Sequence, residues 1–388
     1  MDGAAGLPLP DKGNRTSLEL ARTPNLDRLA KEGFLGLART IPKDMEPSSD
    51  NACLSILGYD PRRYHQGRAA IEATAMGIAL GDSVVFRANL VSIEGGKMKD
   101  YSAGHITTAE AEQIVATLNE ALGADGVSFF PGISYRHICM LKGHDDAVLA
   151  YCTPPHDIFG QEIADFLPRG VGSAFLKDLM ARSEPVLAKH PVNIARVKRG
   201  ELPATMLWLF WGSGKTVDMP PFRELYGVRA AVTSAVDVLK GLGRMMGMEI
   251  LEIPGVKDGL DNDFKAQAKG ALDALKKYDL TVIHIEATDE ASHVGSVEEK
   301  VEAIERIDRD VIAQILEYKG DKVRLLVMPD HLTPIATRTH SPEPVPFLKW
   351  GLGISPNGAK RFTEAEGRRT GFFVDGFNIM KGFVSQSS

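Results

Sequence analysis

Short apolar runs alternate with amphipathic stretches through the second half of this chain. The apolar runs have the pattern of strands, and the stretches between them repeat apolar residues every three or four positions, as helices do. In chain order the expected elements are a helix at 236–246, a strand at 249–253, a helix at 264–277, a strand at 280–285, a helix at 301–315 and a strand at 323–328. Such alternation is typical of βαβ units, so we expect an α/β fold with a largely parallel sheet.

From about residue 83 the chain has a different, mixed pattern. Apolar runs at 84–86 and 90–93 lead into Glu94-Gly95-Gly96-Lys97, which predicts a hairpin turn. Thr107-x-x-Glu110 is a capping box that starts a helix ending at Gly123, and strand-like runs follow at 138–141 and 147–149. We therefore expect a smaller α+β region here.

Two short helices are predicted near the N-terminus. Thr23 and Pro24 suit the N-cap and the first position of one helix, and the other runs from 50 to 57. Ser49 lies at the N-terminus of the second helix, where the helix dipole stabilises negative charge. Coordination to a metal would make its alkoxide accessible near neutral pH, so Ser49 is a candidate nucleophile. A plain helix cap is the alternative interpretation, and Ser48 or Asp50 would serve as well in that role.

Composition narrows the classes of protein to which the chain can belong. Its 388 residues are 44% hydrophobic and carry a net charge of −6 without a dominant basic stretch, which argues against a nucleic-acid partner. No run of about 18 apolar residues is present, so no membrane partner is expected. Three cysteines without CxxC spacing predict neither a disulfide framework nor a thiolate zinc site, and they favour a cytoplasmic location.

Acidic and histidine residues follow the ends of two predicted strands. Asp289 and His293 come just after the strand at 280–285, and Asp330 and His331 come just after the strand at 323–328. Ligand sites in open α/β sheets gather at the carboxyl ends of strands, so we expect these side chains to converge. His340, in a later proline-rich loop, adds another imidazole. Each piece alone fits a turn, a cap or a surface pair, but the ordered set predicts a site for one or two divalent ions.

Several segments together carry a resemblance to a known family. They are Asp2-Gly3, Thr23-Pro24-Asn25-Leu26-Asp27-Arg28-Leu29-Ala30, Ser49-Asp50, Leu54-Ser55-Ile56-Leu57-Gly58-Tyr59-Asp60-Pro61, Gly67-Arg68, Asp289-x3-His293, Pro329-Asp330-His331 and Thr339-His340. In this order the chain resembles the archaeal type of cofactor-independent phosphoglycerate mutases, within the alkaline phosphatase superfamily. The resemblance implies an alkaline-phosphatase-like core formed by residues 1–77 and 196–388. Residues 78–195 would then be an inserted, substrate-binding α+β domain.

The resemblance also implies a reaction and a set of metal ligands. One ion would be held by Asp289, His293 and His340, and the other by Asp2, Asp330, His331 and the Ser49 oxygen. Ser49 would take the phosphoryl group of 3-phosphoglycerate as phosphoserine and return it to the other hydroxyl, giving 2-phosphoglycerate without bisphosphoglycerate. Manganese is the expected metal, with zinc, cobalt or magnesium as alternatives. The partner would be a small phosphorylated hydroxy acid.

In the inserted domain the resemblance points to His105, Arg136 and His156 as substrate-binding residues, together with Arg68 and Lys215. Arginine suits bidentate contacts with phosphate or carboxylate, and histidine can carry the proton of the leaving oxygen. For Arg136 and Lys215 a plain surface charge is the alternative. Lys215 ends a Gly212-Ser213-Gly214-Lys215-Thr216 segment, but a P-loop requires glycine at position 209, which is leucine here.

Two departures from the family pattern leave alternatives open. The strand that the family has before its metal-binding aspartate is absent before Asp2. We therefore expect an uncovered sheet edge and a weakened second metal site. Around His105 and His156 the sequence looks more like a bacterial branch proposed to be archaeal-type homoserine kinases. A homoserine kinase-like phosphotransferase and a catalytically impaired metal-binding homologue are thus the other hypotheses, and the oligomeric state stays open.

Overall fold

A computed structural model of the chain describes residues 1–65, 67–214, 219–318 and 323–385. The chain divides into two compact units, the first formed by residues 1–65 with 219–388 and the second by residues 66–218. The second unit begins before the predicted boundary at 78 and ends after the predicted boundary at 195. The reason is pairing, because the strand at Met206–Ser213 lies in the second unit's sheet and the helix at Arg68–Ala75 packs against it.

The first unit contains two sheets. One has the order β10-β11-β1-β12 and the other the order β8-β7-β9. The pairs β7–β8, β7–β9 and β1–β12 are parallel, whereas β1–β11 and β10–β11 are antiparallel. The α/β class is confirmed, and its parallel pairing is concentrated around β7. The strands are β1 (Phe34–Arg39), β7 (Ala230–Thr233), β8 (Glu249–Ile250), β9 (Leu280–Ile283), β10 (Arg324–Val327), β11 (Val345–Gly351) and β12 (Phe373–Asp375).

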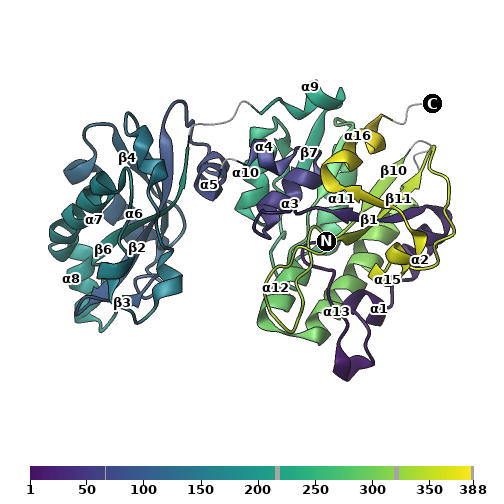
Figure 1. The fold of residues 1–388 in the computed structure, drawn as a ribbon, viewed down its shortest axis with the longest axis horizontal. Helices are drawn as coiled ribbons and strands as arrows, with labels where there is room; N and C mark the ends of the chain where they lie inside the picture. Colours follow the sequence, from purple (N-terminus) through teal and green to yellow (C-terminus); the bar gives the residue numbers. More distant parts are fainter. Residues whose placement is uncertain (66, 215–218, 319–322, 386–388) are drawn as a thin grey trace. The chain divides into compact units, whose positions relative to one another are not determined.

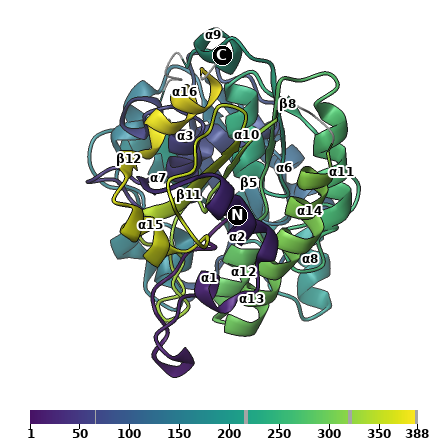
Figure 2. The ribbon, with the colours of Figure 1, turned by 90° about the vertical axis from the view of Figure 1, so that its right-hand side faces the viewer.

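Helices cover these sheets, as Figure 1 shows, with α10 and α11 against β7 and α2 and α15 against β1. In the turned view α11 lies beside α14 (Figure 2). A π-helical turn at Ile307–Ile312 joins α13 to α14, so the single helix predicted at 301–315 is interrupted. The helices are α1 (Ser17–Leu20), α2 (Pro24–Glu32), α3 (Ser49–Ile56), α4 (Pro61–Tyr64), α9 (Phe222–Tyr226), α10 (Asp237–Met245), α11 (Phe264–Ala274), α12 (Ala287–Val294), α13 (Val297–Arg306), α14 (Ala313–Glu317), α15 (Glu364–Thr370) and α16 (Ile379–Val384).

The second unit is a five-stranded antiparallel sheet with helices packed on it. The predicted hairpin at Gly95-Gly96 joins β2 to β3, and the predicted capping box at Thr107 starts α6. The strand predicted at 147–149 is wrong, because Asp145–Leu149 forms a 3₁₀ turn. The elements are β2 (Val84–Glu94), β3 (Lys97–Asp100), β4 (Val127–Phe130), β5 (Arg136–Leu141), β6 (Met206–Ser213), α5 (Arg68–Ala75), α6 (Thr108–Leu122), α7 (Ser173–Ala188) and α8 (Pro191–Lys198).

The longest described helix is α7, with 16 residues. Within the described ranges, we find no helix whose length and apolar character would let it cross a bilayer.

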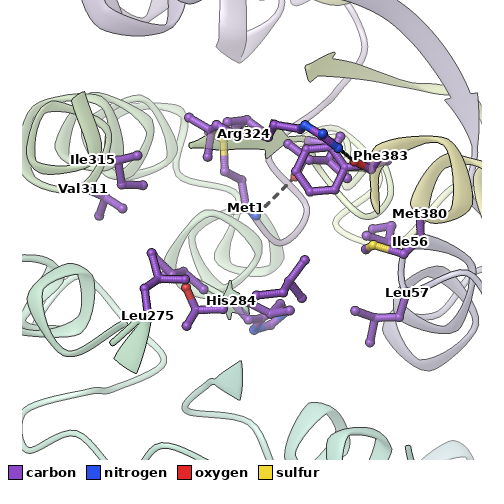
Figure 3. A pocket seen from close by; sticks show the side chains of 18 of the residues that line it. Met1, Ile56, Leu57, Leu275, His284, Val311, Ile315, Arg324, Met380 and Phe383 are labelled. Carbon is purple, nitrogen blue, oxygen red and sulfur yellow. Dashed lines mark hydrogen bonds between the residues drawn. The ribbon is translucent and has the colours of Figure 1, made fainter. Parts of the chain in front are cut away.

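An apolar cavity of about 890 Å³ lies between β9 and β10. Each of these strands is the edge of its sheet, and among the described residues neither has a partner on its cavity side. Figure 3 shows the apolar side chains around the cavity, including Leu57, Ile315 and Met380. Met1 lines the cavity and its amino group donates to Met328 O at 3.3 Å, and the amide of Asp2 donates to Ile285 O at 2.8 Å.

Candidate metal and anion sites

The side chains predicted to follow β9 and β10 come together in the first unit. Asp289 and His293 lie one helical turn apart on α12, and they meet at 2.9 Å between Oδ2 and Nε2. His340 Nε2 is 3.5 Å from Asp289 Oδ2 and 3.1 Å from His293 Nε2. Hydrogen bonds from His293 and His340 lower the pKa of Asp289 despite its burial, and the bond to Asp289 raises the pKa of His293 to about 9. One carboxylate and two imidazoles thus converge on one point.

A second, deeper group surrounds Asp2. His331 Nε2 lies 3.3 Å from Asp2 Oδ1 and 3.3 Å from Asp330 Oδ2, and all three residues are buried. The backbone amides of Gly3 and His331 donate to Asp330 Oδ1 at 2.9 and 2.8 Å. Gly3 has a φ of +56°, and a Cβ on it would lie 2.3 Å from Asp289 Oδ1. The Asp2-Gly3 motif therefore requires glycine at its second position.

The carboxylates of this group are poorly satisfied by the protein. Neither oxygen of Asp2, nor Oδ2 of Asp330, accepts a hydrogen bond of normal geometry within the described residues, although His284 Nε2 is 2.9 Å from Asp2 Oδ2. Burial, with repulsion from Asp330 and Asp289, raises the pKa of Asp2 well above its ordinary value. Buried acids without donors are costly unless a positive charge compensates them. The donor set of carboxylate oxygens and imidazole nitrogens fits divalent cations.

Sequence reasoning missed three members of this cluster. His284 and Glu286 join Asp2 in one group of potential ligand atoms, and Cys53 joins His284 and Asp330 in another, with the atoms of each group within 4.8 Å of one another. Burial and the nearby Asp2 raise the pKa of Glu286 to about 10. The position of His284 and Glu286 directly after β9 was the available signal. The sequence gives no such signal for Cys53, because this residue lies inside an apolar stretch of α3.

Ser49 is the first residue of α3, and Ser48 is its N-cap. Ser49 Oγ lies 3.2 Å from His331 Nε2, so the hydroxyl faces the deeper group. The Ser48 side chain makes no capping hydrogen bond within α3, and its hydroxyl donates instead to Glu46 O at 3.5 Å. The two serines are therefore distinct, and the one predicted as nucleophile adjoins the acid–imidazole cluster.

In the second unit, aromatic rings connect four of the predicted substrate-binding residues. The His105 ring is 6.3 Å from Tyr135, and the guanidinium of Arg136 lies 5.6 Å from the same Tyr135 ring. Tyr101 lies between Tyr135 and His156, at 5.9 and 6.3 Å. His156 and Arg68 both pack on the Trp211 ring, at 5.6 and 5.0 Å. The fifth predicted residue, Lys215, lies outside the described residues.

Arg87, on β2, is a residue that sequence reasoning missed. It is only 8% exposed, its Nη1 lies 3.3 Å from Glu72 Oε1, and its Nε has no hydrogen-bond partner among the described residues. Arg68 Nε lies 3.1 Å from the same Glu72 oxygen. Burial lowers the pKa of Arg87, and the charges of Arg68 and Arg136 lower it further. Two guanidinium groups thus contact one carboxylate, and the charge of Arg136 acts on Arg87 as well, which leaves net positive charge for an anion.

Solved structures share this two-unit α/β fold over the whole chain. The Pyrococcus horikoshii protein PH0037 has a TM-score of 0.83 at 28% identity, with 100% of this chain and 96% of that chain covered. The cofactor-independent phosphoglycerate mutase of Thermoplasma acidophilum has a TM-score of 0.72 at 26% identity, with 100% and 98% covered. The chain is thus an α/β protein of the same fold class as that mutase.

Sequence comparisons narrow the class to a family. A family model described as 2,3-bisphosphoglycerate-independent phosphoglycerate mutase matches residues 30–193. A protein of that name from Methanothrix thermoacetophila is 47% identical, over 99% of this chain and 98% of its own length. A probable mutase of the same kind from Geobacter sulfurreducens is 40% identical, over 98% and 97%. The chain belongs to the 2,3-bisphosphoglycerate-independent phosphoglycerate mutase family.

Proposed function

We propose that this protein interconverts 3-phosphoglycerate and 2-phosphoglycerate through a phosphoserine at Ser49, without a bisphosphoglycerate cofactor. The observation that carries the proposal is the position of Ser49 Oγ, at the N-terminus of α3 and 3.2 Å from His331 Nε2 in the acid–imidazole cluster. A metal-binding protein that had lost catalysis would have no need of a hydroxyl there. The mutase names of relatives at 45–47% identity point to the same reaction.

Two divalent ions, with manganese as first choice, fit the orphaned acids of the cluster. Asp289, His293 and His340 would hold one ion, and Asp2, Asp330, His331 and the Ser49 oxygen would hold the other. When bound, two such metal ions would lower the pKa of a coordinated hydroxyl and stabilise negative charge on phosphoryl oxygens. His284 and Glu286 flank Asp2 and would orient its carboxylate.

Hydrogen bonding fixes the tautomer of His331 that this role needs. Thr333 Oγ1 donates to Asp289 Oδ1 at 2.6 Å, so its single proton is already used. At 3.1 Å it must therefore accept a hydrogen bond from His331 Nδ1. Nε2 of His331 is then unprotonated, with its lone pair directed toward Ser49 and Asp2. Burial lowers the pKa of His331, which keeps this imidazole neutral.

The arginines of the second unit are the proposed binding groups for the small phosphorylated acid. Arg68, Arg87 and Arg136 can donate to its phosphate or carboxylate, because Glu72 offsets only one of the three charges. His105 and His156 lie beside the same aromatic rings and would exchange protons with the substrate hydroxyls. Several such donors would retain the glycerate while it turns between the two phosphoryl transfers.

The relatives' names favour a mutase over transfer of phosphate from ATP to homoserine.

The three cysteines, Cys53, Cys139 and Cys152, are free thiols in the structure, and this suits the reducing cytoplasm as the proposed location.

The test compares wild type with Ser49→Ala and, as a matched control, Ser48→Ala. Turnover of 3-phosphoglycerate is followed with manganese and no bisphosphoglycerate, and phosphate incorporation is mapped by mass spectrometry. We expect wild type and Ser48→Ala to turn over and to carry a phosphoserine at residue 49. Turnover should fall roughly 10³-fold or more in Ser49→Ala. An active Ser49→Ala enzyme would contradict the mechanism. An inactive wild type that phosphorylates homoserine from ATP would favour the kinase.

A further inference from the structure

Strand β6 contains an extra residue where it pairs with β2. Phe210 pairs with Arg87 and Ser213 pairs with Val85, so three steps along β6 match two steps along β2. Trp211 lies in this bulge and has a φ of +49°, a left-handed conformation that bulky residues rarely adopt. Bulges redirect side chains and are frequent beside functional sites. We therefore ask which contacts hold the Trp211 backbone in this conformation and which groups its side chain meets.

Contacts on the C-terminal side of Trp211 hold the bulge in place. A Cβ at Gly212 would lie 2.5 Å from a ring carbon of Phe86, so β6 passes directly over that ring. Ser213 Oγ accepts a hydrogen bond from the amide of Ala70 at 3.1 Å, which ties the bulge to α5. The strained conformation is thus imposed by β2 on one side and by α5 on the other.

The redirected Trp211 side chain touches the cationic groups of the second unit. Its ring centroid lies 5.0 Å from the guanidinium carbon of Arg68 and 5.3 Å from that of Arg87. The His156 ring lies 5.6 Å from the Trp211 ring. These distances are within the range of cation–π attraction. Arg68 and Arg87 therefore share two partners, Glu72 and the indole.

An indole has a property that a second carboxylate would lack. Its π face attracts guanidinium groups without cancelling their charge, whereas another acid would neutralise Arg68 and Arg87 together with Glu72. Two like charges are thus held side by side while the cluster keeps its net positive charge. Arginine side chains are long and carry many rotamers, so a ring that restrains two of them reduces the entropy lost when an anion binds.

We infer that Trp211 is a positioning residue of the anion site: its ring holds Arg68 and Arg87 side by side in the geometry that receives the substrate's anionic group. The identity of that substrate rests on the proposed mutase function. The role of the ring itself can be tested by direct binding, whether or not the protein turns over.

The decisive variants are Trp211→Leu, Trp211→Phe and Trp211→Gly, with Trp350→Phe as matched control because Trp350 donates to Glu32 in the other unit. Binding of 3-phosphoglycerate and of inorganic phosphate is measured by calorimetry in a Ser49→Ala background, and KM and kcat are measured with Ser49 intact. We expect Trp211→Leu to weaken binding and raise KM about tenfold with kcat nearly unchanged. Trp211→Phe should restore most of the affinity.

The glycine variant separates positioning from folding. Glycine adopts a φ near +49° without strain, so Trp211→Gly removes the ring without straining the backbone, and the variant, shown by circular dichroism to be folded, should lose affinity as Trp211→Leu does. Wild-type affinity in both variants would overturn the inference, and so would a wild type that binds neither anion. A wild type that binds them without turnover would contradict only the mutase proposal.

Discussion

The two clusters of candidate functional residues differ in the charge of their side chains. In the first unit, acids and imidazoles, most of them buried, come from the N-terminus, from the ends of β9 and β10, and from the loop that carries His340. In the second unit, arginines and histidines that are mostly exposed gather around the rings of Tyr101, Tyr135 and Trp211. The first cluster has carboxylates in excess and the second has guanidinium groups in excess. A cation completes one and an anion completes the other.

The comparison also shows two ways of fixing a functional side chain. Strand ends, the helix α12 and backbone amides fix the acids, as with Asp330, which accepts from Gly3 and His331. Aromatic contacts restrain Arg68 and Arg136 of the cationic cluster, and these side chains remain exposed at the surface. Metal coordination tolerates little displacement, whereas a substrate that must turn between two transfers needs donors that adjust. We therefore expect substitutions in the first cluster to act mainly on kcat and those in the second mainly on KM.

The largest effect is expected from Asp289→Asn. This change removes the carboxylate that joins His293 and His340, so manganese affinity should fall and turnover should drop roughly 10³-fold. Glu290→Gln is the matched control, because it changes the next, exposed carboxyl group on the same helix. Manganese binding by calorimetry, with turnover, checks the prediction. Undiminished metal binding by Asp289→Asn would break the contrast between the two clusters.

A smaller effect, on KM, is expected from Arg87→Met. The variant removes a buried guanidinium from the anion site, so KM for 3-phosphoglycerate should rise by roughly 10- to 100-fold while kcat changes only a few-fold. Arg182→Met, an exposed change on α7, should behave as wild type. Steady-state kinetics with thermal melting check this, and a fall in kcat at constant KM would contradict it.

The smallest effect is on stability and concerns Lys300, which anchors the loop carrying Asp2. Its Nζ donates to Ala5 O and Thr333 O, and burial lowers its pKa to about 8. Between about pH 8 and the ordinary lysine pKa of about 10.4, the unfolded chain binds more protons than the folded one. The free energy of unfolding should therefore rise with pH relative to Lys300→Met, by about 1 kcal/mol per pH unit. Denaturant titrations of wild type and Lys300→Met at pH 8 and pH 10 test this. An equal change in the free energy of unfolding of both proteins between the two pH values would contradict it.

Sequence patterns predicted the first cluster better than the second. The strands β9 and β10 were recognisable from their apolar runs, so the side chains directly after them were predicted to converge, and Asp289 and His331 do. No pattern predicted that Cys53 would join them, because that depends on how α3 meets the strand ends. No local pattern predicted the left-handed backbone of Trp211 either. It arises from pairing between β6 and β2, which are more than 100 residues apart in the chain.

The boundaries of the second unit show the same limit. The pattern changes near residue 83 and the family resemblance implied a boundary at 78, but α5 precedes both points and packs on β2 and β6. Pairing of β6 with β2 likewise extends the unit beyond residue 195. Long-range pairing decides which unit a segment joins, and a local pattern carries no information about it. The family resemblance supplied the site residues that local patterns left undetermined.

The cavity between β9 and β10 has a consequence for hydrogen exchange. Alternate amides of each strand face the cavity, where no described main-chain partner meets them, so their protection depends on bound water. Although these strands are paired with β7 and β11 on their other sides, their cavity-facing amides should exchange as fast as those of a surface loop. The strand β2, which pairs with β5 on one side and with β6 on the other, should exchange far more slowly. In this molecule, membership of a sheet and protection of its amides from exchange are separate properties.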